Sequence, residues 1–123
     1  MATKFKAGAL FPTITLPTLD KETVSIEQPQ GALDWKMVVV YRGKHCPLCT
    51  RYLNQIEKLK PGFNALGVDI IAVSADSEAQ AQAHSQELEV TFPVAYGMTV
   101  EQMEQLGLYI SHPRSAQETD HPF

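Results

Sequence analysis

The chain has 123 residues, 44% of them hydrophobic and 20% charged, and these values predict one soluble globular domain over residues 1–123. Its formal net charge is −4, and its 10 basic residues are scattered along the sequence, which argues against a nucleic-acid partner. No stretch approaches the ~20 apolar residues of a membrane span, and the apolar run at residues 7–12 is too short for the core of a signal peptide. We therefore expect a cytoplasmic protein with no membrane partner.

The N-terminal part of the chain predicts a small β-hairpin. Residues 14–16 and 23–26 are short alternating segments, and residues 20–22 between them have the composition of a turn. A stretch at residues 28–31 that contains proline and glycine then ends this pattern. We expect the main sheet to begin after this break.

A strand–helix–strand unit follows the hairpin. Residues 37–41 form a continuous apolar, β-branched run, which is typical of a central parallel strand buried on both faces. Apolar residues then recur at helical spacing from Tyr52 until Pro61 and Gly62, where we expect the helix to end. Residues 68–73 form a second buried strand, so this part of the chain predicts a right-handed βαβ unit.

Two further helices and one short strand are predicted toward the C-terminus. A helix over residues 77–88 opens with the spacing of a capping box, and residues 92–96 form a short strand. A second helix over residues 99–106 opens with the same spacing and ends at a glycine. We expect residues 111–123 to be an irregular tail.

Cys46 and Cys49 are the only cysteines of the chain, and they carry its predicted chemistry. In a reducing cytoplasm, a close pair is more consistent with redox chemistry or metal binding than with a permanent structural disulfide. Residues three apart lie on one face of a helix, within the Cα separation that a disulfide tolerates. Pro47 is favoured at the first helical position, so Cys46 is the predicted N-cap and the pair opens the helix.

The first turn of this helix predicts reactive thiols. Its unsatisfied backbone N–H groups and the positive end of the helix dipole stabilise a thiolate and lower its pKa. Arg42, Lys44 and His45 add cationic groups next to the pair, although each is also an ordinary residue of a solvated loop. We treat Arg42 and His45 as supporting residues of the site.

The alternatives to redox chemistry at this cysteine pair are two buried, inert thiols and half of a structural zinc site. Such a zinc site needs four ligands, and His84, His112 and His121 lie far along the chain without a second paired motif. The polar corner just before Cys46 fits poorly with inert burial. We therefore expect neither a metal nor another cofactor.

The order and spacing of these segments carry a family resemblance. They include the strand and corner at residues 38–43, the Cys46-Pro47-Leu48-Cys49 segment that opens residues 46–53, and residues 67–76, 92–94 and 106–109. Through them the chain resembles the thioredoxin-like superfamily and, more closely, its peroxiredoxin branch, the alkyl hydroperoxide reductase and thiol-specific antioxidant family. The resemblance implies an α/β fold, a thioredoxin-like three-layer α/β/α sandwich with an N-terminal β-hairpin.

The resemblance leaves the roles of the two cysteines open. In peroxiredoxins, a Thr-x-x-Cys pattern places the peroxide-attacking cysteine at Cys49 and puts Cys46 where the family has a threonine or serine. In thioredoxins the first cysteine attacks, which would make Cys46 the nucleophile and Cys49 the resolving cysteine. Pro47 and Thr50, which adjoin the pair, complete the supporting residues of the site.

The function implied by the resemblance is that of a thiol-dependent antioxidant oxidoreductase that reduces hydrogen peroxide or organic hydroperoxides. Oxidation of one thiolate to a sulfenic acid and condensation with the other thiol give a disulfide, which an external thiol reductant reduces. Two alternatives stay open. One is a thiol-disulfide oxidoreductase that acts on protein disulfides, and the other is a non-catalytic redox-sensing or assembly module.

The resemblance also implies a C-terminal hairpin with a cis-proline, a closing helix and an arginine from a later strand, but the sequence stops at Phe123. Arg42, Arg51 and Arg114 are the arginines available as substitutes. Without the hairpin, residues 37–41 become an apolar edge strand, which invites pairing with another chain. We therefore expect an incomplete C-terminal part, as in a fragment of a longer protein, or a homo-oligomer that covers this edge.

Overall fold

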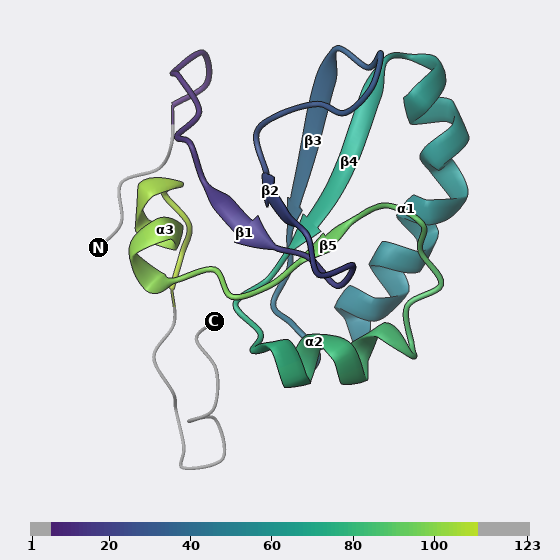
Figure 1. The fold of residues 1–123 in the computed structure, drawn as a ribbon, viewed down its shortest axis with the longest axis vertical. Helices are drawn as coiled ribbons and strands as arrows, with labels where there is room; N and C mark the ends of the chain where they lie inside the picture. The colour runs from purple at the N-terminus through teal and green to yellow at the C-terminus, as the bar shows by residue number, and fades with distance from the viewer. Residues whose placement is uncertain (1–5, 111–123) are drawn as a thin grey trace.

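The computed structural model describes residues 6–110, which form a parallel β-sheet covered by helices (Figure 1). The sheet contains β3 (Trp35–Val40), β4 (Val68–Val73) and β5 (Val94–Ala95) in the order β3-β4-β5, and both neighbouring pairs are parallel. Helix α1 (Pro47–Ala65) connects β3 to β4, so the predicted strand–helix–strand unit is confirmed. Within the described residues, none of the helices combines the length and the apolar character that crossing a membrane requires.

The predicted N-terminal hairpin is also confirmed. It consists of β1 (Thr15–Pro17) and β2 (Thr23–Ser25), which pair antiparallel. Just after β1, Thr18 forms an antiparallel bridge with Ala95 of β5. The hairpin therefore covers the β5 edge of the main sheet.

Helices lie on both faces of this sheet. α1 and α2 (Glu78–Ser85) lie on one face, and α3 (Val100–Gln105) lies with the hairpin on the other (Figure 1). Because side chains alternate along a strand, β4 contributes Ile71 to the core beneath the hairpin and Ala72 to the core beneath α1. The architecture is the predicted thioredoxin-like α/β/α sandwich.

Helix α1 does not end at Pro61 as predicted but continues through it to Ala65. A proline inside a helix removes one backbone hydrogen bond and costs about 3 kcal/mol. Phe63, which lies beyond the proline, packs against the apolar core beneath α1, and this contact favours the additional turn. The helix ends just before Gly67, which adopts a left-handed φ of +80°.

The two later helices begin where they were predicted. Ser77 and Thr99 each form a complete capping box at the N-terminus of α2 and α3. α2 is shorter than expected, because the amides of residues 86–88 bond three residues back instead of continuing the helical pattern. The predicted irregular tail at residues 111–123 lies outside the described residues.

The position of β3 differs from the first expectation. It was predicted to be central and buried on both faces, but it is an edge strand whose four middle residues are half-buried and whose end residues, Trp35 and Val40, are 70% and 38% exposed. The reason is that, within residues 6–110, no strand pairs with its outer edge. The structure thus agrees with the exposed edge that the family resemblance implied.

Candidate active site

The corner between β3 and α1 is held by a buried carboxylate. Asp76, which follows β4, accepts a hydrogen bond from the Lys44 amide at 2.8 Å. Gly43 has a φ of +125°, which favours glycine, and a β-carbon at this position would collide with the Asp76 carboxylate. Sequence reasoning missed this role of Asp76, although the carboxyl ends of adjacent parallel strands meet at one edge of a sheet.

Cys46 is the N-cap of α1, as predicted, and Pro47 occupies the start of the helix. The Cys46 side chain is only 6% exposed, and its Sγ accepts a hydrogen bond from the Cys49 amide at 3.3 Å. The Thr50 amide bonds to the Cys46 carbonyl at 3.2 Å. Cys46 is therefore a buried thiol that also caps the N-terminus of the helix.

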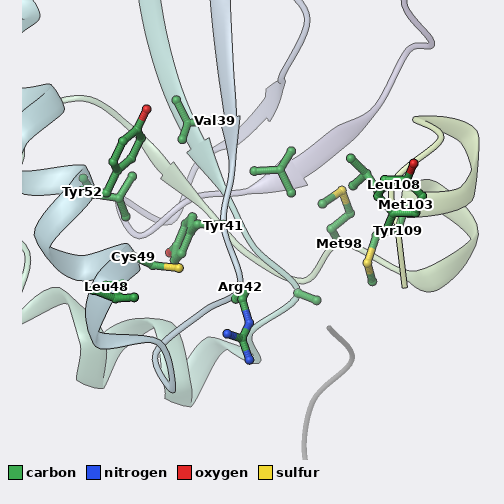
Figure 2. A pocket seen from close by; sticks show the side chains of 13 residues that line it. Val39, Tyr41, Arg42, Leu48, Cys49, Tyr52, Met98, Met103, Leu108 and Tyr109 are labelled. Atoms are coloured by element: carbon green, nitrogen blue, oxygen red, sulfur yellow. The ribbon is translucent and has the colours of Figure 1, made fainter. Parts of the chain in front are cut away.

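Cys49 is half-buried and lines a cavity of about 540 Å³. The cavity lies over the outer edge of β3, with α1 on one side and the segment around α3 on the other (Figure 2). Its lining is predominantly apolar and consists of Val39, Val40, Tyr41, Arg42, Leu48, Cys49, Tyr52, Leu53, Ala75, Met98, Met103, Leu108 and Tyr109. Of the two cysteines, only Cys49 faces this space.

The electrostatic environment of Cys49 differs from the prediction. Burial raises the pKa of the Cys49 thiol, and its hydrogen bond with the Cys46 thiol raises that pKa further. The backbone N–H and the charge of Arg42 act in the opposite direction. The predicted lowering of the pKa is wrong for Cys49. Its thiol lines an apolar cavity, and the amide N–H of Cys49 is bonded to the Cys46 sulfur.

The predicted supporting residues, and the arginines considered as substitutes, differ in whether they line the cavity. Arg42 lines the cavity, and its side chain extends from the end of β3 (Figure 2). His45 is half-buried and is not among the lining residues. The exposed Arg51 is not among them either, and Arg114 lies outside the described residues. Thr50 is directed to α2 instead of the cavity.

His84, on α2, is a site residue that sequence reasoning considered only as a zinc ligand. Its side chain is 0% exposed, and its Nε2 lies 2.6 Å from the Thr50 hydroxyl. Burial lowers the pKa of this imidazole. Its spacing from Ala81, the other buried residue of α2, was the available signal for a core-facing position.

Tyr41 contacts both the cavity and α2. Its ring centroid lies 6.0 Å from that of His84, and it also lines the cavity beside Cys49 (Figure 2). Burial raises the pKa of Tyr41 to about 12, so its hydroxyl is neutral at physiological pH. The site therefore presents a thiol to an apolar cavity with a neutral phenol beside it.

The described residues include no group of three histidine, cysteine or acidic side chains that could hold a metal ion. His84, the described member of the three histidines considered as ligands, bonds to Thr50. His112 and His121 lie outside the described residues. The chemistry that the described site offers is that of its two thiols.

Comparison with known proteins agrees with the fold. The model of the AhpC/TSA family matches residues 7–121 of the chain. A comparison with curated protein sequences gives no match.

Several solved structures share the fold. The chain is 18% identical to a peroxiredoxin-like protein from Aquifex aeolicus, with a TM-score of 0.72, covering 90% of this chain and 63% of that one. It is 20% identical to a cysteine-to-serine mutant of peroxiredoxin 6 of Arenicola marina, with a TM-score of 0.76, covering 94% of this chain and 55% of that one. A protein from Bacteroides thetaiotaomicron, described as a candidate protein disulfide isomerase, is 18% identical, with a TM-score of 0.65 and coverages of 88% and 69%.

These similarities support the fold. They also show how much of the related structures the chain covers. The chain spans less than two thirds of the length of the first two structures, 63% and 55%. The described part contains the cysteine pair and the sheet around it.

Proposed function

The chain belongs to the AhpC/TSA family, and from this membership we propose that it is a thiol-dependent oxidoreductase that reduces hydrogen peroxide or organic hydroperoxides. In this proposal Cys49 attacks the peroxide, and Cys46 resolves the oxidised sulfur. The cycle needs an external thiol reductant and no cofactor.

One observation supports this division of roles above all others. Cys49 lines the cavity, whereas Cys46 is 6% exposed and is engaged as the helix N-cap. A substrate that enters the cavity therefore meets the Cys49 sulfur first. A disulfide reductase of the thioredoxin kind would need the first cysteine to be the accessible one, so the arrangement favours peroxide reduction over protein-disulfide reduction.

The proposed reaction has three balanced steps. The Cys49 thiolate attacks the terminal oxygen of the hydroperoxide, the O–O bond breaks, and Cys49 becomes a sulfenic acid. The leaving alkoxide or hydroxide takes up the proton that the thiol released on ionisation, and it departs as an alcohol or water. The Cys46 thiol then attacks the Cys49 sulfur, which forms the S–S bond and releases water. An external dithiol finally reduces the disulfide by thiol exchange and is itself oxidised.

Arg42 is a cationic residue that favours the attack of Cys49 on the peroxide. Its charge and its backbone N–H both lower the pKa of Cys49, which counteracts the effect of burial. The low polarity of the cavity has two consequences, because it disfavours the thiolate but also strengthens any charge interaction made there. We propose that Arg42 raises the fraction of Cys49 that is ionised.

Peroxide consumption by the full chain, with dithiothreitol as reductant, tests this function. We expect consumption of hydrogen peroxide and of cumene hydroperoxide well above that of dithiothreitol alone, and loss of this consumption in Cys49→Ser. Insulin-disulfide reduction is measured with the same preparation. Insulin reduction without peroxide consumption would favour the disulfide-reductase alternative, and absence of both activities would favour the non-catalytic module.

A further inference from the structure

A hydrogen bond joins the cysteine-bearing turn of α1 to α2. The Thr50 hydroxyl, one residue after Cys49, lies 2.6 Å from Nε2 of His84. The imidazole is 0% exposed, so no water competes for this contact. This bond attaches the turn that carries Cys49 to the interior of the protein.

The second ring nitrogen of His84 restricts the charge of the imidazole. Nδ1 is buried and has no hydrogen-bond partner among residues 6–110. A neutral ring with its proton on Nε2 leaves Nδ1 as an unpaired acceptor, whereas a charged ring would bury an unpaired N–H donor. The geometry therefore favours a neutral imidazole that donates to Thr50.

The surrounding charges act on this preference in opposite directions. Burial is the largest influence on the imidazole and lowers its pKa. Asp76 and Glu87 raise the pKa of His84, and Lys44 lowers it. The neutral phenol of Tyr41 packs against the ring. Burial prevails, so the imidazole becomes charged only at acid pH.

We propose that His84 is a positioning residue of the thiol site, which holds the Cys46–Cys49 turn in its reactive arrangement by donating a hydrogen bond to Thr50 from Nε2 of its buried imidazole. The bond fixes Thr50 against α2, and the Thr50 amide in turn bonds to the Cys46 carbonyl. The first turn of α1 is thereby held so that Cys49 faces the cavity. This inference deepens the proposed function, because it concerns the same attacking thiol.

Reaction of Cys49 with 4,4′-dithiodipyridine tests the proposal without any peroxide. The parent protein is the full chain with Cys46→Ser, which leaves Cys49 as the single thiol and keeps an N-cap hydroxyl. Thr50→Val and His84→Gln are added to this parent singly and together, and Thr50→Ser is the matched control that keeps the hydroxyl. Circular dichroism verifies that each variant folds.

At pH 8 we expect Thr50→Val to react about fivefold more slowly than the parent, the effect of one lost hydrogen bond. Thr50→Ser should react within about twofold of the parent, because it keeps that bond. At a pH below the lowered pKa of His84, the charged ring would bury an unpaired N–H at Nδ1 and should leave its buried position, so the ratio of the parent rate to the Thr50→Val rate should approach one. In the His84→Gln background, the effect of Thr50→Val should not depend on pH.

A folded Thr50→Val variant that reacts at the parent rate would overturn the proposal. The same conclusion follows if the ratio of rates is the same at pH 8 and at an acid pH where NMR shows that His84 is charged. If Thr50→Val does not fold, the comparison of the parent with His84→Gln decides, because only the parent should lose reactivity in excess of thiol protonation at acid pH.

The two proposals fail separately. A protein whose Cys49 labels as expected but does not react with peroxide keeps the role of His84 and loses the peroxidase function. A protein that consumes peroxide, but whose Cys49 labels at the same rate with and without the Thr50 hydroxyl, keeps the peroxidase function and loses the role of His84.

Discussion

The Cys49 amide donates a hydrogen bond to Sγ of Cys46 at 3.3 Å, so the buried cysteine is also the N-cap of the helix that carries the half-buried one. The two thiols of the pair are thus unequal before any chemistry takes place. The Cys46 sulfur accepts a backbone hydrogen bond, whereas the Cys49 side chain lines the cavity.

Cap function at Cys46 predicts a difference between two substitutions. Cys46→Ala removes the acceptor for the Cys49 amide and should lower the free energy of unfolding by about 1 kcal/mol, whereas Cys46→Ser should keep the cap and the stability. Urea unfolding of the reduced variants measures this. Equal stability of the two variants would mean that the sulfur contributes nothing as a cap.

The corner before α1 is tested by an alanine substitution at Gly43, and the same substitution at Gly62, inside α1, is its control. Gly43→Ala forces an alanine to a φ of +125° and against Asp76, and it should lower the free energy of unfolding by about 2 kcal/mol or more. Gly62→Ala lies in α1 with open space around its β-carbon and should stabilise the protein by about 0.5–1 kcal/mol. Thermal unfolding of both variants compares them, and a tolerated Gly43→Ala would contradict the close approach of Asp76.

The buried His84 predicts a loss of stability in acid. Its pKa in the folded protein is lowered, so between that value and the unfolded value of about 6.5 the unfolded chain binds a proton that the native chain does not. This contribution to stability is complete above the unfolded pKa. It is lost as the pH falls from about 6.5 toward the folded pKa, by at most about 1.4 kcal/mol per pH unit.

Urea midpoints between pH 8 and pH 5 measure this dependence. His84→Gln removes the titrating group and should flatten the wild-type curve in that range. A wild-type curve as flat as that of the variant would show that His84 titrates normally in the folded protein.

The outer edge of β3 predicts self-association. Val40 is 38% exposed on this strand, and within the described part of the chain no strand pairs with its outer edge. An open apolar edge of this kind favours pairing with a second copy of the chain. Light scattering should detect a dimer or larger species, and Val40→Lys should shift it toward monomer. Val100→Lys, on the similarly exposed apolar surface of α3, is the matched control. A monodisperse monomer at high concentration would contradict this expectation.

Much of the fold follows from local patterns in the sequence. Cys46 as N-cap, Pro47 at the helix start and the capping boxes at Ser77 and Thr99 are each set by a few neighbouring residues, and the structure agrees with all of them. The continuation of α1 through Pro61 depends on the packing of a residue beyond it, which local propensity does not reveal.

The site was less predictable because its residues come from distant segments. Cys46 and Cys49 are recognisable from their spacing, but Asp76 reaches the corner before α1, and His84 the first turn of α1, only through the fold. The direction of the Cys49 pKa was wrong for a similar reason. The helix N-terminus is visible in the sequence, whereas the apolar cavity that buries the thiol is formed by several elements.

The most direct test of the proposed roles is to locate the first oxidised sulfur. The reduced variants Cys46→Ser and Cys49→Ser are each treated with one equivalent of hydrogen peroxide in the presence of dimedone, and the adducts are located by mass spectrometry. We predict rapid formation of a sulfenic acid adduct at Cys49 in Cys46→Ser, and only slow reaction of the buried Cys46 in Cys49→Ser. Faster trapping at Cys46, or reaction of neither thiol above the rate of free cysteine, would contradict the assignment of Cys49 as the attacking thiol.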